Sequence, residues 1–257
     1  MGVMIAWVRI TTVAVLLATL GCSDSSKPRV RVFAAASLTR SFEALTVAFE
    51  AENPGVEVEL HCAGTPRLVL QLREGAAADV FASADDIQMQ RVVNAGQTSA
   101  VPINFASNQL IIITAYGNPH AIRSLADLQA PGLGVLMCGP NVPAGRYARE
   151  ALHKAGVQVQ SRSDEPSVRA VISKVRLGVA DAGIVYATDA RAEARQDGAL
   201  GTHIHQVAIP KHQNILTRYP IAPLSTGTHG SLGAAFVAFV TGPAGQAILA
   251  SHGFGKP

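Results

Sequence analysis

Short apolar segments alternate along this chain with longer stretches in which apolar residues recur every three or four positions. Residues 29–33 and 56–60 have strand character, and the second of these alternates apolar residues with glutamates. Between them, residues 38–52 place their apolar side chains on one helix face: Leu38, Phe42, Leu45 and Phe49. Strands that lead directly into helices are typical of α/β proteins with mostly parallel sheets.

The same rhythm continues to the end of the chain. Further strands are predicted at residues 79–83, 109–115, 134–138, 182–186, 203–209 and 218–222. Further helices are predicted after the N-cap Thr65 up to Gly75, from Asp85 to about Gly96, after Gly145 through Leu152, between Ser167 and Gly178, from Thr188 onward, and at 230–241 and 243–252.

These elements predict two lobes, each a mostly parallel sheet flanked by helices, with a ligand cleft between them. The long apolar strand 109–115 is expected to cross from the first lobe to the second, and strand 218–222 to lead back. We therefore assign residues 29–108 and 220–257 to lobe 1 and residues 109–219 to lobe 2. Lobe 1 is then discontinuous in the sequence.

The first 21 residues differ in character from the rest. Arg9 precedes an apolar run from Ile10 to Leu20 that is too short to cross a bilayer as a settled helix. We interpret residues 1–21 as a secretory signal peptide, and the alternative is an N-terminal anchor helix. Residues 22–28 would then form a polar tether.

Cys22 adds a more specific prediction. Leu20-Gly21-Cys22 resembles the end of a bacterial lipoprotein signal, whose cysteine is acylated after cleavage, although Thr19 stands where that signal usually has leucine. We favour a lipoprotein in the periplasm, anchored through Cys22, over ordinary soluble export. The lipid would be its only contact with a membrane.

Composition narrows the classes of partner. The chain has 257 residues, 48% of them hydrophobic, which is enough to bury the cores of two lobes. Its net charge of +3 comes from well-mixed acidic and basic residues, and only 5% of residues are aromatic. A nucleic-acid partner is therefore not expected, because both the basic surface and the stacking platforms are lacking.

Five positions fall where ligands bind in open α/β sheets, at the carboxyl ends of strands and the starts of helices. They are Ser37, Thr65, Ala144, Val168 and Tyr186. Their hydroxyls and backbone N–H groups are neutral hydrogen-bond donors, which satisfy a fully ionised oxyanion that has only acceptors. No tip offers a carboxylate, so the sequence predicts selection against protonated anions such as phosphate.

Each of these positions also has an ordinary interpretation: Ser37 and Thr65 as helix caps, Ala144 as a core residue, Tyr186 as a strand-end aromatic. An enzyme is not expected, since no G-x-S-x-G or H-E-x-x-H motif occurs. His203 and His205, with His212 nearby, form either a metal site or a solvent-facing strand edge. Cys62 and Cys138 are either a disulfide or two separate thiols.

From Val30 onward the chain resembles the periplasmic molybdate-binding proteins of ABC importers. The resemblance rests on VFAAASLT at 32–39, GAAADVFASAD at 75–85, VPAGRYA at 142–148, ADAGIVYATDA at 180–190 and YPIA at 219–222. It implies the type II periplasmic-binding-protein fold, a hinge between lobes, no cofactor, and delivery of molybdate, and of tungstate, to a membrane permease by a monomer. In that family the anion is held at positions matching Ser37, Thr65, Ala144, Val168 and Tyr186.

The chain also departs from the family pattern. Thr65 replaces the usual serine, and Pro66 removes one backbone N–H. Arg67, Arg146 and Arg169 follow the tips closely, and we interpret them as solvated helix residues. Receptors for sulfate or another tetrahedral oxyanion, and an oxyanion-sensing module, remain the alternatives within this resemblance.

Acylation of Cys22 is directly testable. The protein expressed in a bacterial host with radiolabelled palmitate is expected to carry the label, and Cys22→Ala is expected to lose it. Labelling is read from a gel of the purified protein. An unlabelled wild-type protein would refute the lipoprotein interpretation.

Overall fold

The computed structural model describes residues 27–196 and 204–257. The predicted signal peptide, the predicted lipidation site Cys22, and His203 lie outside the described residues. The strands are β1 Arg29–Ala35, β2 Glu57–Ala63, β3 Val80–Ala82, β4 Ile103–Asn108, β5 Leu110–Thr114, β6 Val135–Cys138, β7 Asp164–Glu165, β8 Ala182–Tyr186, β9 His205–Ala208 and β10 Thr217–Pro223. The helices are α1 Thr39–Glu52, α2 Thr65–Arg73, α3 Asp86–Asn94, α4 Pro143–Lys154, α5 Val168–Arg176, α6 Ala187–Gln196, α7 Gly230–Thr241 and α8 Pro243–Ser251.

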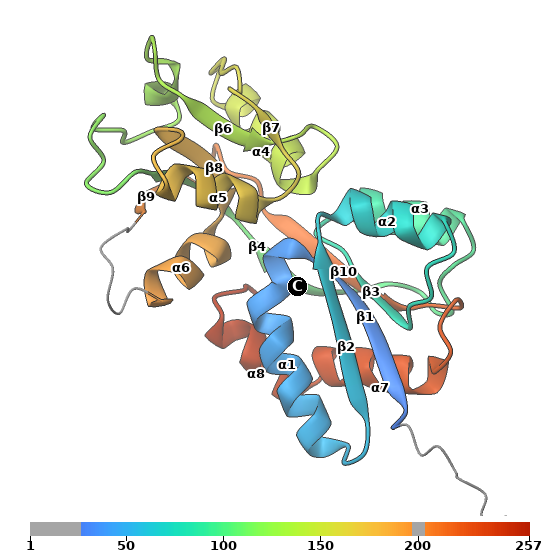
Figure 1. Cartoon of the computed structure of the whole chain (residues 1–257). Helices are drawn as coiled ribbons and strands as arrows, with labels where there is room; N and C mark the ends of the chain where they lie inside the picture. Colours follow the sequence, from blue (N-terminus) through green and yellow to red (C-terminus); the bar gives the residue numbers. More distant parts are fainter. Residues whose placement is uncertain (1–26, 197–203) are drawn as a thin grey trace, which may run out of the picture.

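The strands form two sheets, one in each lobe, in the arrangement visible in Figure 1. The first has the order β2-β1-β3-β10-β4 and the second β7-β6-β8-β5-β9. Each sheet is mixed: β1 pairs in parallel with β2 and β3, whereas β10 is antiparallel to β3 and β4. The second sheet repeats this plan, with β6 parallel to its neighbours and β5 antiparallel to β8 and β9.

Helices cover both faces of the first sheet. Successive residues of a strand point to opposite faces, and in these strands the residues on both faces are apolar. Val32 and Ala34 of β1 point into a core shared with α1 and α7, and Phe33 points to the opposite core under α2 and α3. The α1–α7 face contains an aromatic cluster in which Phe42 meets both Phe105 and Phe236. This packing fixes the turn that follows β1.

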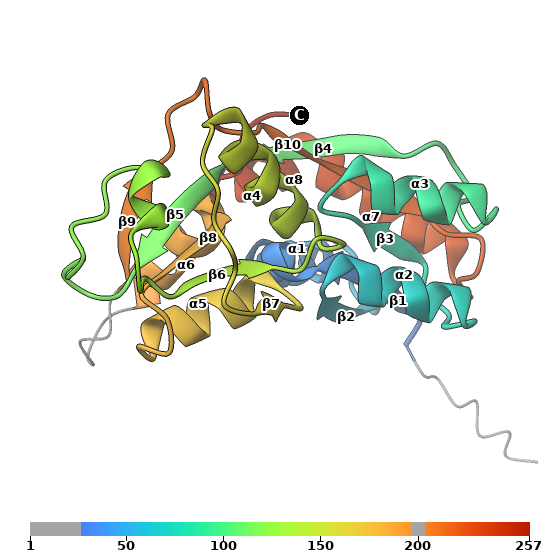
Figure 2. The same ribbon diagram turned by 90° about the horizontal axis from the view of Figure 1, so that it is seen from above.

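The lobes are joined where the chain leaves β4 of one sheet and enters β5 of the other (Figure 2). β4 belongs to the first sheet and β5 to the second, with only Gln109 between them. The predicted crossing at residues 109–115 is thus one half of a longer connection. The sequence pattern missed β4, because its residues Ile103–Asn108 are too polar and irregular to stand out as a strand. The division at residues 108/109 and 219/220 stays a prediction, and β10 pairs with the first sheet along its whole length.

The remaining elements follow the predicted order closely. Ser167 caps α5 by accepting a hydrogen bond from the Ala170 N–H, and Gly178, with φ +70°, follows the end of that helix. Asp85 caps α3 through the Gln88 N–H. Within residues 27–196 and 204–257, no single helix has the length and apolar character to cross a membrane; only α7 and α8 taken together, bent by 59°, meet those criteria.

A buried carboxylate ties three parts of the first lobe together. Asp79 is fully buried and accepts hydrogen bonds at 2.7 Å from the backbone N–H groups of Arg31 in β1 and His229 at the start of α7. Each carboxylate oxygen serves one donor. An asparagine at this position would offer one oxygen acceptor, and its NH2 group would face the second N–H, so that two donors would meet.

Asp79→Asn is therefore expected to lower the free energy of unfolding by about 1–3 kcal/mol, because one buried N–H loses its acceptor. Urea unfolding followed by circular dichroism measures the change. The exposed Glu52→Gln, at the end of α1, is the control and should stay within about 0.5 kcal/mol of wild type. Equal stability of the two variants would contradict the assignment.

Candidate functional site

The two predicted positions of the first lobe lie at turns that follow neighbouring parallel strands. β1 ends at Ala35 and runs through a short 3-10 turn, Ala36–Leu38, into α1, which places Ser37 at the edge of the sheet. β2 ends at Ala63 and runs through Gly64 into α2. Gly64 is the N-cap of that helix, so the prediction that Thr65 caps it was wrong: Thr65 is already its first residue. Its backbone N–H therefore points out of the helix end.

The second lobe supplies the other three positions in the same way. Ala144 is the second residue of α4, Val168 is the first residue of α5, and Tyr186 is the last residue of β8. The first amides of a helix have no acceptor within that helix, and they carry the positive end of its dipole. All three side chains are buried.

The structure brings all five positions together. They line one small cavity between the lobes, with about 20 Å³ of room for the centres of water-sized atoms. Its lining comprises Ala35, Ala36, Ser37, Gly64, Thr65, Ala84, Val142, Pro143, Ala144, Ser167, Val168 and Tyr186. Among these described lining residues none carries a charged side chain. The polar groups that the cavity presents are hydroxyls and backbone groups.

Tyr186 presents the clearest unmet hydrogen-bonding capacity in the site. Its side chain is 1% exposed, and its buried hydroxyl makes no hydrogen bond within the described protein. Such a group is costly unless a partner reaches it. Burial, reinforced by the neighbouring Tyr219, raises the pKa of Tyr186 well above its usual value. The phenol therefore stays protonated and can act as a donor toward the cavity.

The hydroxyl of Ser37 is oriented by groups behind it. The Asn108 side-chain oxygen accepts from the Gln109 N–H at 2.9 Å, so the amide nitrogen of Asn108 must face the Tyr219 hydroxyl, at 3.3 Å. Tyr219 then accepts from Asn108, and its hydroxyl also lies 3.2 Å from Ser37 Oγ, where either hydroxyl can be the donor. If Tyr219 donates, Ser37 keeps its own hydrogen for a ligand.

The lobes touch directly at the cavity. A Cβ atom built on Gly64 would lie 2.3 Å from the carbonyl oxygen of Pro166, so only a glycine allows the α2 turn to approach the second lobe this closely. Gly145, in α4, is equally constrained: a Cβ there would lie 2.1 Å from the carbonyl oxygen of Cys138. Small residues thus let backbone amides reach the cavity.

The three arginines near the tips have different environments. Arg67 is exposed, as predicted. Arg146 is not simply solvated, because its Nη2 donates to Asp85 Oδ2 at 2.7 Å, and its guanidinium carbon lies 4.2 Å from the centre of the Tyr147 ring. Burial opposes the charge of Arg146, yet the hydrogen bond to Asp85 leaves its pKa above the usual value. Arg169 donates weakly, at 3.4 Å, to Thr39 Oγ1 in the first lobe.

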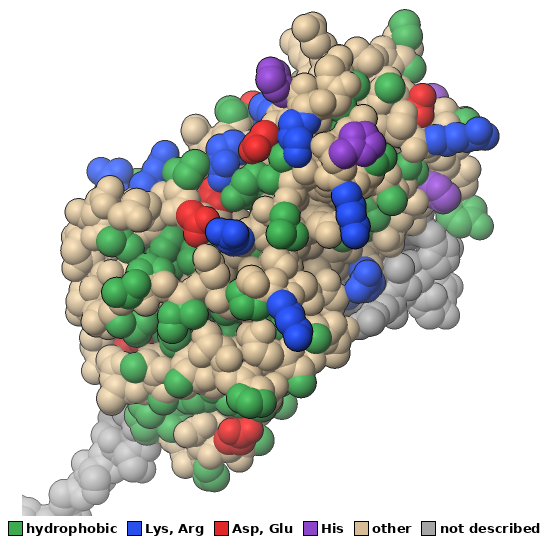
Figure 3. All heavy atoms as spheres, turned by 180° about the vertical axis from the view of Figure 1, so that it is seen from behind, with side chains coloured by type: hydrophobic (Ala, Val, Ile, Leu, Met, Phe, Trp, Pro, Cys, Tyr) green, Lys and Arg blue, Asp and Glu red, His purple; other side chains and the backbone are tan. Residues whose placement is uncertain are grey.

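A larger cleft of about 330 Å³ adjoins the small cavity and shares Ala36 and Ser37 with it. Charged side chains from both lobes line this cleft: Arg40, Glu43, Arg169, Arg176 and Asp189. We place the candidate site in the smaller cavity, because it alone collects all five predicted positions. On the face in Figure 3, Lys and Arg side chains are scattered among acidic and apolar ones.

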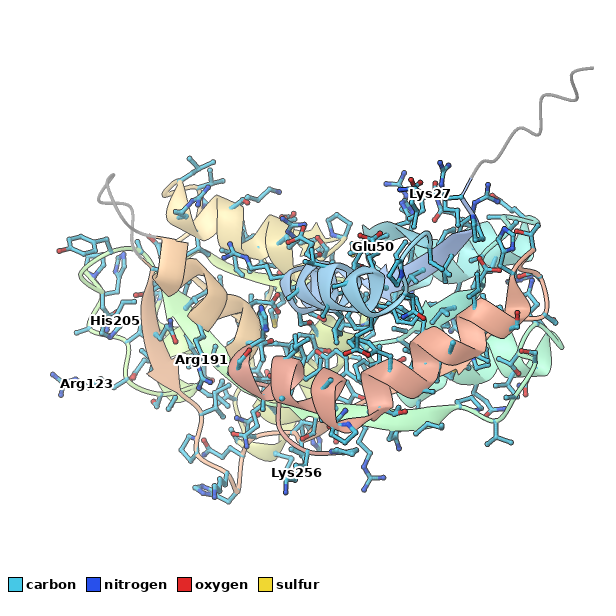
Figure 4. All side chains as sticks on the ribbon, turned by 90° about the horizontal axis from the view of Figure 1, so that it is seen from below. Lys27, Glu50, Arg123, Arg191, His205 and Lys256 are labelled. Atoms are coloured by element: carbon cyan, nitrogen blue, oxygen red, sulfur yellow. The ribbon has the colours of Figure 1, made fainter. Side chains whose placement is uncertain are left out.

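The other candidate groups lie apart from the cavity. Cys62 and Cys138 are free thiols, and burial raises the pKa of both. His205 is exposed on β9, the edge strand of the second sheet, at the outer end of the molecule in Figure 4. Within residues 27–196 and 204–257 no cluster of three or more His, Cys, Asp or Glu side chains has metal-binding geometry.

Sequence reasoning missed the groups that support the five positions. Asn108 and Tyr219 lie 111 residues apart, and only the pairing of β10 with β4 brings them together behind Ser37. The YPIA segment at 219–222 was noticed as a motif, but no pattern in it signals the partner of its tyrosine. Gly64 and Pro166 meet only because the lobes do.

Comparison with known proteins identifies the family of the chain. The family model described as bacterial extracellular solute-binding protein matches residues 30–255. The molybdate-binding protein ModA of Mycobacterium tuberculosis (strain ATCC 25618 / H37Rv) is 44% identical over 226 residues, which cover 88% of this chain and 84% of the relative.

Two solved structures share the fold at lower identity. The periplasmic molybdate-binding protein of Azotobacter vinelandii has a TM-score of 0.74 at 18% identity, over 89% of this chain and 99% of that one. The sulfate-binding protein SubI of Mycobacterium tuberculosis H37Rv has a TM-score of 0.78 at 23% identity, over 88% and 86%. At these identities the two structures establish the two-lobed fold alone.

Two tyrosines at the site are expected to respond oppositely to removal of their hydroxyls. Tyr186→Phe should leave the free energy of unfolding unchanged or raise it by up to about 1 kcal/mol, because an unsatisfied buried group is lost. Tyr219→Phe should lower it by about 1–2 kcal/mol, because Ser37 and Asn108 lose a partner. Urea unfolding in oxyanion-free buffer measures both. Equal losses in the two variants would contradict the assignment of Tyr186 as the unpartnered donor.

Proposed function

This chain belongs to the bacterial extracellular solute-binding protein family, and on that premise we propose that it is the molybdate receptor of an ABC importer. The observation that carries the proposal is a small interlobe cavity lined by residues from both lobes, among them four with hydroxyl side chains and the first residues of α2, α4 and α5, and by no charged side chain. The relative that is 44% identical is named as a molybdate-binding protein, which supports the choice of ligand.

The donors suit a tetrahedral dianion. Ser37, Thr65 and Tyr186 offer hydroxyl hydrogens, and the starts of α4 and α5 offer the amides of Ala144 and Val168. Five hydrogen bonds to a charged acceptor amount to roughly 7.5–15 kcal/mol before the cost of association. Micromolar affinity requires about 8 kcal/mol net, so it needs the upper part of this range, with the donors held in place before the anion arrives.

Exclusion of protonated anions follows from the same chemistry. A protonated oxygen would need an acceptor, and the side-chain oxygens at the cavity are hydroxyls rather than carboxylates. Tyr186 stays a donor because burial raises its pKa. The O–H of an anion such as hydrogen phosphate would be left unpartnered, or would be accepted by a hydroxyl that then no longer donates to the anion, and either costs about 1–3 kcal/mol.

The size of the cavity favours one compact ion. Room of about 20 Å³ for the centres of water-sized atoms corresponds to a sphere with a radius of roughly 1.7 Å. Four oxygens around one central atom fill such a sphere. Molybdate and tungstate have the same charge and nearly equal size, so we propose that tungstate binds as well, and that the smaller sulfate binds less tightly.

The chain is a receptor and not an enzyme. Closure of the lobes about the β4–β5 connection would surround the anion, and opening would release it to the permease. We further propose that the protein acts in the periplasm as a monomer, held at a membrane by a lipid on Cys22. The lobe boundaries at residues 108/109 and 219/220 belong to the same proposal.

Isothermal titration with molybdate, tungstate and sulfate tests the function. Molybdate and tungstate should bind with micromolar or tighter affinity, and sulfate at least about tenfold more weakly. Tyr186→Phe should weaken molybdate binding by about 1.5–3 kcal/mol, which is about 10–150-fold, because one donor to the anion is lost.

Arg67→Ala is the control for this titration, because Arg67 lies near the start of α2 but is exposed. It should bind molybdate as wild type does. Sulfate binding as tight as molybdate binding would refute the choice of ligand. Wild-type affinity in Tyr186→Phe would show that the tyrosine is structural.

A further inference from the structure

We propose that Asp85 and Arg146 form a latch between the lobes that slows dissociation of the anion. The inference rests on the proposed function only in requiring that the interlobe cavity holds an oxyanion. Asp85 belongs to the first lobe, immediately before α3, and Arg146 belongs to α4 of the second. Their side chains meet at 2.7 Å.

The latch adjoins the wall of the cavity. Ala84, which precedes Asp85, lines it, and so does Ala144, two residues before Arg146. A second contact runs parallel to the ion pair: the Gln88 side-chain nitrogen donates to the Asn141 carbonyl oxygen at 3.1 Å. The two contacts join the α3 end of one lobe to the α4 end of the other.

Asp85 is buried where the lobes meet. Its side chain is 1% exposed, and its two oxygens are used by different lobes: Oδ1 accepts from the Gln88 N–H at 2.8 Å, and Oδ2 accepts from Arg146. Separation of the lobes would return Oδ2 to water. Asp85 would therefore keep its helix-capping bond in an open form and lose only the bond to Arg146.

Arg146 is prepared for this contact within its own lobe. Its guanidinium lies over the Tyr147 ring, and its side chain is 32% exposed. Stacking on an aromatic ring limits the freedom of the side chain before it meets Asp85. The pairing also keeps the guanidinium on a carboxylate, so that the anion cavity stays lined by neutral donors.

The physical consequence is kinetic. Without Arg146, the closed form would hold the Asp85 carboxylate buried with one oxygen unpaired, whereas the open form would hydrate it. The substitution therefore destabilises the closed form alone and shifts the equilibrium toward the open form. Capture of the anion by the open form is not affected, so release should accelerate while association stays nearly constant.

Stopped-flow tyrosine fluorescence with molybdate measures both rates on the full mature protein. Arg146→Met is expected to raise koff by about tenfold and to weaken Kd by the same factor, with kon changed by less than about twofold. Arg146→Lys, which keeps the charge but not the planar fork, should lie between Arg146→Met and wild type. Arg67→Met is the matched control near the start of α2 and should leave both rates unchanged.

A double-mutant cycle separates the latch from independent local effects. Asp85→Asn retains an acceptor for the Gln88 N–H, and it should raise koff about as much as Arg146→Met does. The double variant should release molybdate no faster than the faster single variant, because the two residues act as one contact. Thermal melting of the anion-free variants confirms that each is folded.

The failures are distinguishable. A wild-type protein that binds no oxyanion would refute the proposed function. A wild type that binds molybdate, together with an Arg146→Met variant whose koff is unchanged, would refute the latch alone. Fully additive increases in koff in the double variant would also refute it, since the two residues would then act separately.

Discussion

The site depends on one constraint: buried hydrogen-bond donors need acceptors. The amides that begin α4 and α5 have no acceptor in their own helices, and the Tyr186 hydroxyl makes no hydrogen bond of good geometry among residues 27–196 and 204–257. Both lobes place such donors around a single cavity. An oxyanion bound there would supply the acceptors that these donors lack.

Small residues and displaced charges make this arrangement feasible. Gly64 lets the α2 turn approach the Pro166 carbonyl, and Gly145 lets α4 start against the end of β6. The nearest arginine in α4, Arg146, is held by Asp85 instead of entering the cavity. The hydrogen-bonded chain from Asn108 through Tyr219 holds the Ser37 side chain from behind. Binding strength therefore comes from geometry rather than from net charge.

Two connections join the lobes: β4 passes into β5 through Gln109, and residues 209–216 return from β9 to β10. The proposed closure would need backbone rotation at both connections. The first sheet is covered by helices on both faces. The contacts that resist opening are those made across the cleft, chiefly Asp85 with Arg146 and Gln88 with Asn141.

Local patterns in the sequence determined the strands, the helices and the starts of helices where the donors lie. The pattern from Val30 to Ser37, for example, predicts a strand that leads into a helix, because apolar alternation and helical spacing are both short-range signals. Tertiary structure alone decided that Arg146 would face Asp85 and that Tyr219 would stand behind Ser37. It also placed β4 in the first sheet. These contacts join residues 61 and 182 positions apart, and no local pattern encodes a partner at such a distance.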